Sequence, residues 1–327
     1  VPAAHEVAQE VGGHLDGCRI GFDLGASDYK VAAVREGEVV FSEEFPWNPR
    51  VEADPEYHYR HLSQGVRVAA SHLPRVDAIG GSSAGVIVGN KIMVASLLRS
   101  VPPEKFDAGK NLFLRLREEW GVPLEVANDG DVTALAGAMS LGEDGVLGVA
   151  MGSSEAAGFI DRKGHILGWL NELAFAPIDY NGEAPAEEWS GDRGVGALYF
   201  SQQAVNKLLP AAGIPVPSGM GLPERLKEVQ GLMAKGDPRA AKIYETIGVY
   251  LGYGAAHYAD FYDFRHMLIL GRVTTGEGGN ILLARAKAVL EGEFPDLAGR
   301  ISLHLPDEKS RRVGQAVAAA SLPEIRR

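Results

Sequence analysis

From residue 18 onward, the chain shows short hydrophobic runs separated by polar turns. Residues 18–24 and 30–34 are apolar runs of strand length, and the turn at 25–28 between them contains glycine and serine. Two such runs around a glycine-containing turn are typical of a β-hairpin. A third run at 38–42 extends the pattern, so we expect an antiparallel meander of three strands.

Apolar positions then change to helical spacing. Pro55 follows Asp54, which suits a first helical residue and its cap, and Leu62, Val66 and Ala69 recur on one face. Later segments predict strands at 76–80, 85–88, 123–127 and 266–271, and helices at 104–120, 197–208, 222–235 and 238–258. Strands that alternate with helices predict an α/β fold.

The opening pattern occurs a second time about one domain length later. Residues 145–151 and 157–160 flank a second glycine-bearing turn that begins at Gly152. We therefore expect two copies of one βββαβα unit, packed around a central cleft. The predicted domains are 1–140, with the first hairpin, and 141–327, with the second.

Composition narrows the classes of protein and of partner. Hydrophobic residues make up 46% and charged residues 23% of 327 residues, which is ordinary for a globular chain. The net charge of −11 disfavours nucleic acid and anionic membranes. The single cysteine, Cys18, excludes an internal disulfide, and no apolar run approaches the roughly 20 residues of a membrane span. Since the start also lacks a secretory pattern, we expect a cytoplasmic protein.

Three glycine-rich loops are candidates for phosphate binding. Turns rich in glycine and serine expose backbone N–H groups that suit phosphate oxygens. Two of the loops are the hairpin turns. The third is the loop at 271–279, which follows the strand at 266–271 and precedes a helix. The turn at 25–27 alone is more simply an ordinary hairpin turn. Together the three loops predict a nucleotide site.

Asp129 is the candidate catalytic carboxylate. It follows an apolar strand and precedes a helix, where an α/β sheet presents residues to its ligand. A carboxylate there can accept a hydroxyl proton during phosphoryl transfer. The alternative is that Asp129 only caps the helix, although we expect Asp131 to be its cap.

The ordered motifs resemble the ROK family of bacterial sugar kinases. The segments that carry this resemblance are 21–34, 126–137, 148–160, 168–177, 191–195 and 268–279. The resemblance spans about residues 18–320 and implies two RNase-H-like domains of the actin-like ATPase superfamily, which close on ATP and substrate.

The resemblance also implies a role for individual residues. Nucleotide-binding positions implied by it are Asp23, Gly25, Ser27, Lys30, Gly152, Ser153, Gly271, Arg272 and Gly276. Asp23 is implied to act through Mg²⁺. For the substrate, the resemblance implies Asn128 and Glu172 as sugar ligands and Asp129 as the general base. A homodimer is implied as well.

Several positions depart from the family pattern. Phe175 stands where the family has a histidine that contacts sugar and zinc, and the zinc segment, here 188–195, retains no metal ligand. Ala197 replaces a further sugar-binding glutamate. Zinc is therefore not expected, and we expect packing, with Trp189 involved, to hold that loop. The loss of two polar ligands also argues against an ordinary glucose pocket.

Two further substitutions fall on the nucleotide side. Glu155 places a carboxylate beside the second hairpin, where it repels polyphosphate unless a metal bridges them. Arg272 replaces a glycine and can stack on adenine or neutralise phosphate. Both changes also fit a protein that no longer uses ATP. Arg99, near another sugar-contacting position of the family, is interpreted as a surface cation, with the alternative that it engages an acidic substituent of the substrate.

The leading hypothesis is an ATP- and Mg²⁺-dependent kinase for a hydroxyl of a sugar or sugar-like polyol. The alternative is a catalytically silent, kinase-like protein that binds or senses a sugar. A transcriptional repressor is disfavoured, because only about 18 residues precede the first strand and the charge opposes DNA.

Overall fold

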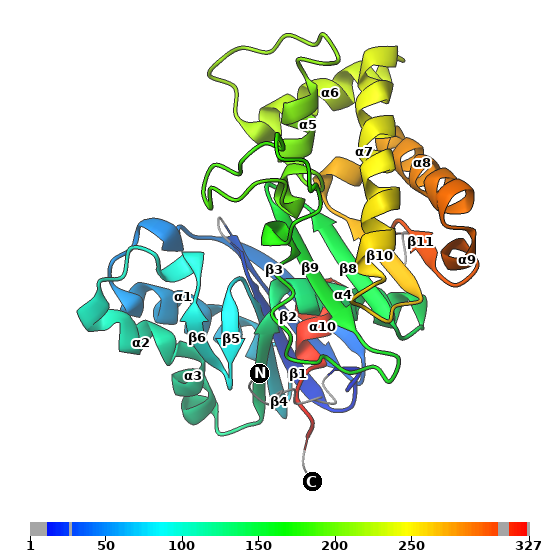
Figure 1. Ribbon diagram of the computed structural model, residues 1–327. Coiled ribbons are helices and arrows are strands. Elements are labelled where there is room, and N and C mark those ends of the chain that lie inside the picture. The colour runs from blue at the N-terminus through cyan, green and yellow to red at the C-terminus, as the bar shows by residue number, and fades with distance from the viewer. Residues whose placement is uncertain (1–11, 26–27, 307–313, 326–327) are drawn as a thin grey trace, which may run out of the picture. The chain divides into compact units, whose positions relative to one another are not determined.

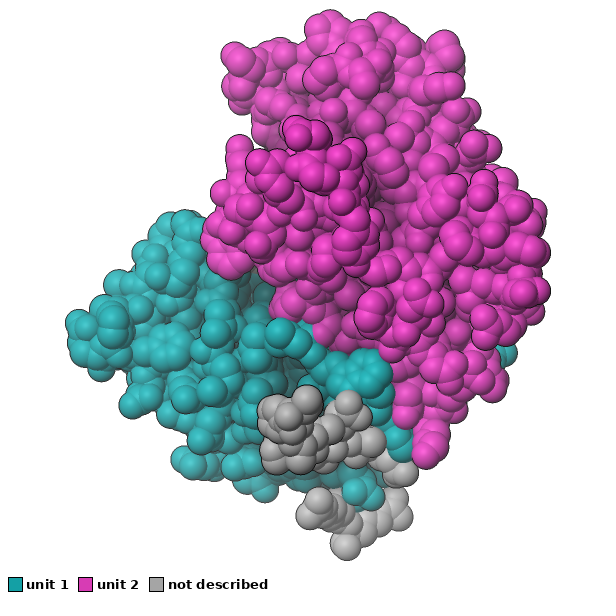
Figure 2. Space-filling model, viewed as in Figure 1, with its two compact units in different colours: residues 1–143, 164–170, 308–327 teal, residues 144–163, 171–307 magenta. Residues whose placement is uncertain are grey.

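The computed structural model describes residues 12–25, 28–306 and 314–325, and these form two compact units (Figure 2). Unit 1 consists of residues 1–143, 164–170 and 308–327, and unit 2 of residues 144–163 and 171–307. The division expected at residue 140 assigns the C-terminal segment to the second domain, whereas its contacts place it in unit 1. No helix in the described part of the chain has the length and apolar character needed to span a bilayer.

A mixed five-stranded sheet forms the centre of unit 1 (Figure 1). Its strands, in spatial order, are β3 (Glu38–Pro46), β2 (Asp28–Arg35), β1 (Cys18–Leu24), β4 (Ala78–Ser83) and β7 (Leu124–Asn128). β1, β2 and β3 pair antiparallel as the expected meander, and β4 and β7 continue the sheet parallel to β1. The carboxyl ends of β1, β4 and β7 therefore meet at one edge.

The two faces of this sheet are covered by different helices. Ile20, Phe22 and Leu24 alternate along β1 into a core with α1 (Pro55–Ala70) and α3 (Leu112–Trp120). The opposite face packs against α10 (Gln315–Ala320), and α4 (Asp129–Leu141) contacts α10.

Glycines make the approach of α10 possible. A Cβ on Gly21 would lie 1.5 Å from the carbonyl oxygen of Ala316, and one on Gly80 would lie 1.6 Å from that of Ala319. The fully buried Arg19 extends from β1 on the same face and donates to the carbonyl oxygen of Pro323 at 2.6 Å. The C-terminal segment is thus an integral layer of unit 1.

Unit 2 repeats the sheet order of unit 1. Its strands, in spatial order, are β9 (Glu155–Ile160), β8 (Val146–Met151), β10 (His266–Leu270) and β11 (Ser302–His304). The helices of this unit are α5 (Gln202–Leu208), α6 (Leu222–Ala234), α7 (Pro238–Tyr258), α8 (Glu277–Glu293) and α9 (Pro295–Ala298). The order β9-β8-β10-β11 matches β2-β1-β4-β7, with the same antiparallel and parallel pairings. The α/β fold of two related domains is confirmed.

Local differences from the expected elements have local causes. The helix expected at 104–120 is split into η3 (Pro103–Lys105), α2 (Phe106–Lys110) and α3, since Asn111 turns its side chain back to the carbonyl oxygen of Asp107 at 2.8 Å. The helix expected at 197–208 consists of η5 (Gly196–Leu198) and α5. The second unit lacks the third meander strand, because only isolated bridges occur among the described residues between β9 and α5.

The remaining short elements complete both units. They are η1 (Pro49–Val51), β5 (Val86–Val88), β6 (Lys91–Val94) and η2 (Ser96–Leu98) in unit 1, and η4 (Leu173–Phe175) and η6 (Arg272–Thr274) in unit 2. β5 and β6 form a separate two-stranded sheet.

Candidate functional site

Polar residues gather at the carboxyl ends of the parallel strands in unit 1. The register sets Asp23 of β1 opposite Ser82 of β4, and Ser83 of β4 opposite Asn128 of β7. This edge is where open α/β sheets present ligand-binding residues. The strand register therefore brings together Asp23, Asn128 and, one residue further, Asp129.

Asp23 is a half-buried carboxyl held by a serine. Its Oδ1 accepts a hydrogen bond from Ser82 Oγ at 2.7 Å. Burial raises the pKa of Asp23 to about 6, and the nearby charge of Asp129 adds to that rise, while the Ser82 bond and the Lys30 cation lower it. Lys30 lies opposite Asp23 on β2, exposed, and pairs with Glu44 at 3.6 Å.

Asn128, and not Asp131, is the N-cap of α4. Its Oδ1 accepts from the backbone N–H of Gly130 at 2.7 Å, and its Nδ2 donates to the carbonyl oxygen of Gly85 at 2.9 Å. The prediction that Asp131 caps this helix is wrong. The helix begins at Asp129, so Asp131 lies buried in its first turn. Asp129 is therefore not needed as a cap.

Asp129 occupies the first position of α4. Its Oδ1 accepts from the Gly130 N–H at 3.0 Å, and its carbonyl oxygen accepts from Gln315 Nε2 of α10 at 3.2 Å. Burial raises the pKa of Asp129, and backbone N–H bonds oppose the rise. A carboxylate with a raised pKa is a better proton acceptor near neutral pH.

The carboxylates of Asp23 and Asp129 at this edge of the sheet fit a divalent cation whose remaining ligands are water and phosphate oxygens. Asp23 and Asp129 lie within each other's field, and a cation would relieve their repulsion. Among the described residues, no group of three or more His, Cys, Asp or Glu could hold a metal ion. Mg²⁺ commonly binds through one or two carboxylates together with water and phosphate oxygens, which suits this arrangement.

The first hairpin turn is held by a tryptophan that the sequence did not indicate. Trp47 Nε1 donates to the carbonyl oxygen of Gly25 at 2.9 Å. A Cβ on Gly25 would lie 2.8 Å from the carbonyl oxygen of Asp28, so the turn leaves little room for a side chain there. Ser27 lies outside the described residues.

The second hairpin turn, Gly152–Ser154, belongs to unit 2. The Gly152 N–H donates to the Ser154 carbonyl oxygen at 3.0 Å, and the Gln202 N–H donates to the Gly152 carbonyl oxygen at 2.9 Å. Ser153 is exposed at the tip. Backbone hydrogen bonds at Gly152 thus hold the turn, and its tip at Ser153 is exposed to solvent.

The glycine-rich loop of unit 2 lies against this second hairpin. Gly271 has a φ of +97°, and a Cβ there would lie 2.4 Å from the carbonyl oxygen of Met151, the last residue of β8. Gly276, with a φ of +75°, precedes α8. Arg272 is exposed, and its guanidinium makes no hydrogen bond or ion pair with another described residue. The structure therefore brings Gly152, Ser153, Gly271 and Arg272 into one region.

Glu155 is turned into the interior of unit 2. Only 5% of it is exposed, and the Tyr258 hydroxyl donates to its Oε1 at 3.1 Å. Burial raises the pKa of Glu155 to about 8, and the Tyr258 bond only partly opposes this. At pH 7 the residue is therefore mostly a neutral acid. The expected repulsion between Glu155 and polyphosphate does not arise from a neutral carboxyl.

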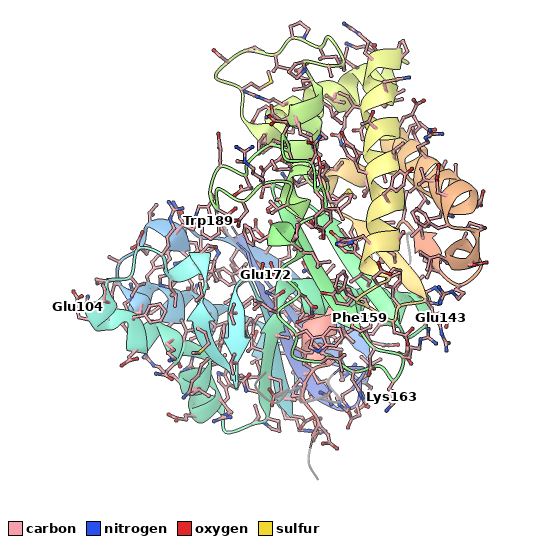
Figure 3. All side chains as sticks on the ribbon, in the orientation of Figure 1. Glu104, Glu143, Phe159, Lys163, Glu172 and Trp189 are labelled. Carbon is pink, nitrogen blue, oxygen red and sulfur yellow. The ribbon has the colours of Figure 1, made fainter. Side chains whose placement is uncertain are left out.

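Glu172 and the segment 188–195 also belong to unit 2. Figure 3 labels Glu172 and Trp189. Glu172 is half-buried and precedes η4. The Phe175 and Trp189 rings are 5.4 Å apart, although 82% of Trp189 remains exposed. Glu187, which the sequence did not indicate, accepts from the N–H groups of Trp189 and Ser190 at 2.8 and 2.7 Å.

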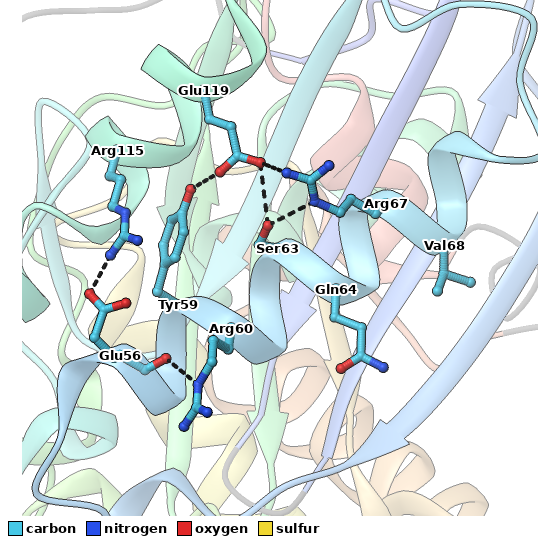
Figure 4. Close-up of a pocket in the computed structure, with 9 residues that line it drawn as sticks. All are labelled: Glu56, Tyr59, Arg60, Ser63, Gln64, Arg67, Val68, Arg115 and Glu119. Carbon is cyan, nitrogen blue, oxygen red and sulfur yellow. Dashed lines mark hydrogen bonds and ion pairs between the residues drawn. The ribbon is translucent and has the colours of Figure 1, made fainter.

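Unit 1 also carries a surface pocket of about 520 Å³ on α1 and α3 (Figure 4). Arg115 lies 3.6 Å over the Tyr59 ring and pairs with Glu56, while Arg67 pairs with Glu119. The lining residues are Glu56, Tyr59, Arg60, Ser63, Gln64, Arg67, Val68, Arg115 and Glu119. None of the predicted site residues lines it. Arg99 is exposed elsewhere in unit 1, at the end of η2.

No protein-family model matches the chain, and no curated protein matches it. Solved structures do match. A ROK hexokinase from Thermus thermophilus is 19% identical with a TM-score of 0.68, over 92% of this chain and 97% of that chain. A ROK family glucokinase from Streptomyces griseus, solved with glucose and AMPPNP, is 19% identical with a TM-score of 0.64, over 93% and 98%.

A regulator shares the fold as well. A ROK family transcriptional regulator, a homolog of the E. coli MLC protein, is 18% identical with a TM-score of 0.68, over 94% of this chain and 79% of that chain. Likeness at this level of identity shows a common fold, and one fold can carry different functions. Together with the duplicated sheets and the polar strand ends, these matches show that the chain has the fold of the ROK sugar kinases and regulators.

Proposed function

We propose that the chain is an ATP-dependent kinase that transfers the γ-phosphoryl group to a hydroxyl of a sugar or sugar-like polyol. The observation that carries this proposal is Asp129, a partly buried carboxylate with a raised pKa that Asn128 relieves of helix capping. Asp129 is not the cap, although its Oδ1 also accepts from the Gly130 N–H at 3.0 Å. Its raised pKa suits a group that takes a proton near neutral pH.

The proposed roles in unit 1 follow from this edge of the sheet. Asp129 accepts the proton of the attacking hydroxyl as the phosphoryl group arrives. Asn128 and the position of Asp129 at the start of α4 are proposed to orient the Asp129 side chain. Gln315 donates a hydrogen bond to the Asp129 carbonyl oxygen. Asp23 would hold Mg²⁺ together with nucleotide phosphates, and Mg²⁺, when bound, supplies positive charge to the transferring group.

The proposed nucleotide site in unit 2 relies on backbone groups. Gly152 and Ser153 would bind phosphate oxygens, and Gly271 and Gly276 would line the nucleoside. Arg272 is free to stack on the base or to pair with phosphate. Because the net charge is −11, we expect these local contacts, rather than a general basic surface, to hold the phosphates.

The proposed acceptor differs from glucose in how it is recognised. Phe175 and Ala197 provide no hydrogen-bonding group, and Ala197 is fully buried. Asn128 already uses its carboxamide within unit 1. Glu172 is the remaining predicted sugar ligand, so we expect a substrate with fewer hydroxyls held by direct side-chain bonds.

A screen of sugars, polyols and amino sugars for ADP release tests the proposed activity. With an acceptor identified, Asp129→Asn is expected to lower kcat at least 100-fold, because general-base catalysis typically supplies about 10²–10⁴. The Kd for Mg-AMPPNP, measured by calorimetry, is expected to change less than threefold. Full turnover by the Asp129→Asn variant would show that Asp129 is not the base.

A second candidate is a protein that binds a sugar without phosphorylating it. The substitutions at Phe175 and Ala197, and the regulator with the same fold, favour it. Heat of binding with a sugar, together with no ADP release in the same mixture, would support this candidate. A homodimer and a cytoplasmic location stay predictions, and sedimentation velocity measures the first.

A further inference from the structure

Glu155 is coupled to the second hairpin by position. It is the first residue of β9 and pairs with Met151, so only Gly152, Ser153 and Ser154 separate the two partners. The hairpin tip is exposed while the Glu155 side chain is buried. A change of charge on the Glu155 carboxyl therefore occurs in the interior, next in sequence to the hairpin turn Gly152–Ser154.

The two oxygens of this carboxyl have different surroundings. Oε1 accepts the Tyr258 hydroxyl at 3.1 Å, whereas Oε2 is buried with no hydrogen-bond partner among the described residues. A Cβ on Gly196 would lie 2.1 Å from Oε2 and 2.4 Å from the carbonyl oxygen of Leu173. A side chain at position 196 would thus collide with Oε2, so the bare glycine makes room for the buried carboxyl. A carboxyl oxygen buried without a partner is tolerated best when the carboxyl is protonated, because burial disfavours the charged form.

No cation compensates a charge at this position. On α7 the titratable neighbours are Tyr258 and, beside it, His257. Tyr262 follows the end of α7, and Glu172 precedes η4. β8 and η5 carry no titratable residue. In the described part of the chain, no lysine or arginine forms an ion pair with Glu155. Burial accordingly raises the pKa of this carboxyl to about 8.

Building on the proposed nucleotide site, we propose that Glu155 is a positioning residue whose proton keeps the hairpin Gly152–Ser154 able to accept polyphosphate. With the proton, the carboxyl is neutral and links the hairpin to α7 and η4. Without it, an unpaired negative charge lies buried three residues from Gly152. That charge repels phosphate through a low-dielectric interior. The carboxylate also has no proton to donate any longer, although it still accepts the Tyr258 hydroxyl.

Amide NMR of the full chain without nucleotide tests the coupling directly. The Gly152 and Ser153 signals are expected to titrate with a midpoint near pH 8 in the wild type and to lose this titration in Glu155→Gln. Tyr258→Phe is expected to raise the midpoint, because the tyrosine bond favours the charged carboxylate. A purely structural role for Glu155 predicts no such shift. Unchanged titration in Glu155→Gln overturns the proposal.

Calorimetry with Mg-AMPPNP tests the consequence for binding. Between pH 7.0 and 9.5 the wild-type Kd is expected to rise at least tenfold, and that of Glu155→Gln less than threefold. Comparing the two proteins cancels the titration of the nucleotide itself. Glu187→Gln is the matched control, since Glu187 is also a buried glutamate of unit 2 but has a lowered pKa, so its variant should keep the wild-type ratio.

The outcomes separate this inference from the proposed function. Binding of AMPPNP with the same pH dependence in wild type and Glu155→Gln overturns the role of Glu155 and leaves the kinase proposal standing. No binding at any pH overturns the kinase proposal, and the amide titration then decides by itself whether Glu155 controls the hairpin.

Discussion

Asn128 and Asp129 are neighbouring side chains for which we propose two different tasks. Asn128 accepts from the Gly130 N–H and so caps α4, and we propose that the adjacent carboxylate of Asp129 takes a proton. The sequence indicated both residues but placed the cap at Asp131, because hydrophobic spacing does not show on which residue a helix begins. Ser82, which bonds to Asp23, lies 59 positions away in sequence, and only the strand register reveals it.

Glu155 also predicts a stability effect at the scale of one residue. Its pKa is about 8 in the folded protein and ordinarily 4.5, so the folded chain holds a proton that the unfolded chain has released between these values. Stability contributed by this group is therefore full below pH 4.5 and falls by about 1.4 kcal/mol per pH unit up to pH 8.

Glu155→Gln removes this slope, because glutamine does not titrate. The difference in unfolding free energy between variant and wild type is expected to move in favour of the variant from pH 5 to pH 8. Urea unfolding at pH 5, 6.5 and 8 measures it. Parallel stability curves for the two proteins would contradict the raised pKa.

At the scale of elements, the strip formed by Gly21 and Gly80 determines how closely α10 packs on the sheet. Their missing side chains leave the space that the α10 backbone occupies. The sequence predicted β1 and the span of α7 well, since both have strong periodicity and clear ends. It did not predict α10 or β11, since short segments of six and three residues give too few positions for a pattern.

Gly21→Ala and Gly80→Ala are each expected to destabilise the protein by about 3 kcal/mol or more, because a Cβ there collides with backbone that cannot move without lifting α10. Gly292→Ala is the matched control. A Cβ on Gly292, inside α8, meets no atom within 4 Å, so helix propensity should raise stability by about 0.5–1 kcal/mol. Thermal and urea unfolding measure all three, and equal effects would contradict the close contact.

At the scale of the whole molecule, the chain returns to its first unit after completing the second. The internal duplication was predictable, since two hairpins with the same turn chemistry lie one domain length apart. The return of residues 314–325 to unit 1 was not predictable. Dividing the sequence at a single boundary cannot show that a segment distant in sequence packs on the other face of a sheet. Arg19 depends on this segment for its Pro323 bond.

A fragment of residues 12–143 is therefore expected to be unfolded or insoluble by itself. Joining residues 314–325 to it by a flexible glycine-serine linker is expected to restore a cooperative unfolding transition, because the glycine strip and Arg19 regain their partners. Circular dichroism during heating compares the fragment with and without the joined segment. A cooperative transition in the shorter fragment would show that α10 is not needed for unit 1.

The missing third strand of unit 2 has a consequence for how this protein can diversify. In unit 1, β3 covers the outer edge of β2, whereas in unit 2 β9 is the edge strand of its sheet and contacts η4, within the segment that holds Glu172 and Phe175. An uncovered strand edge invites pairing with other chains. The segment proposed to select the acceptor is therefore also expected to shield β9, so substitutions in it that change the substrate are expected to affect solubility as well as recognition.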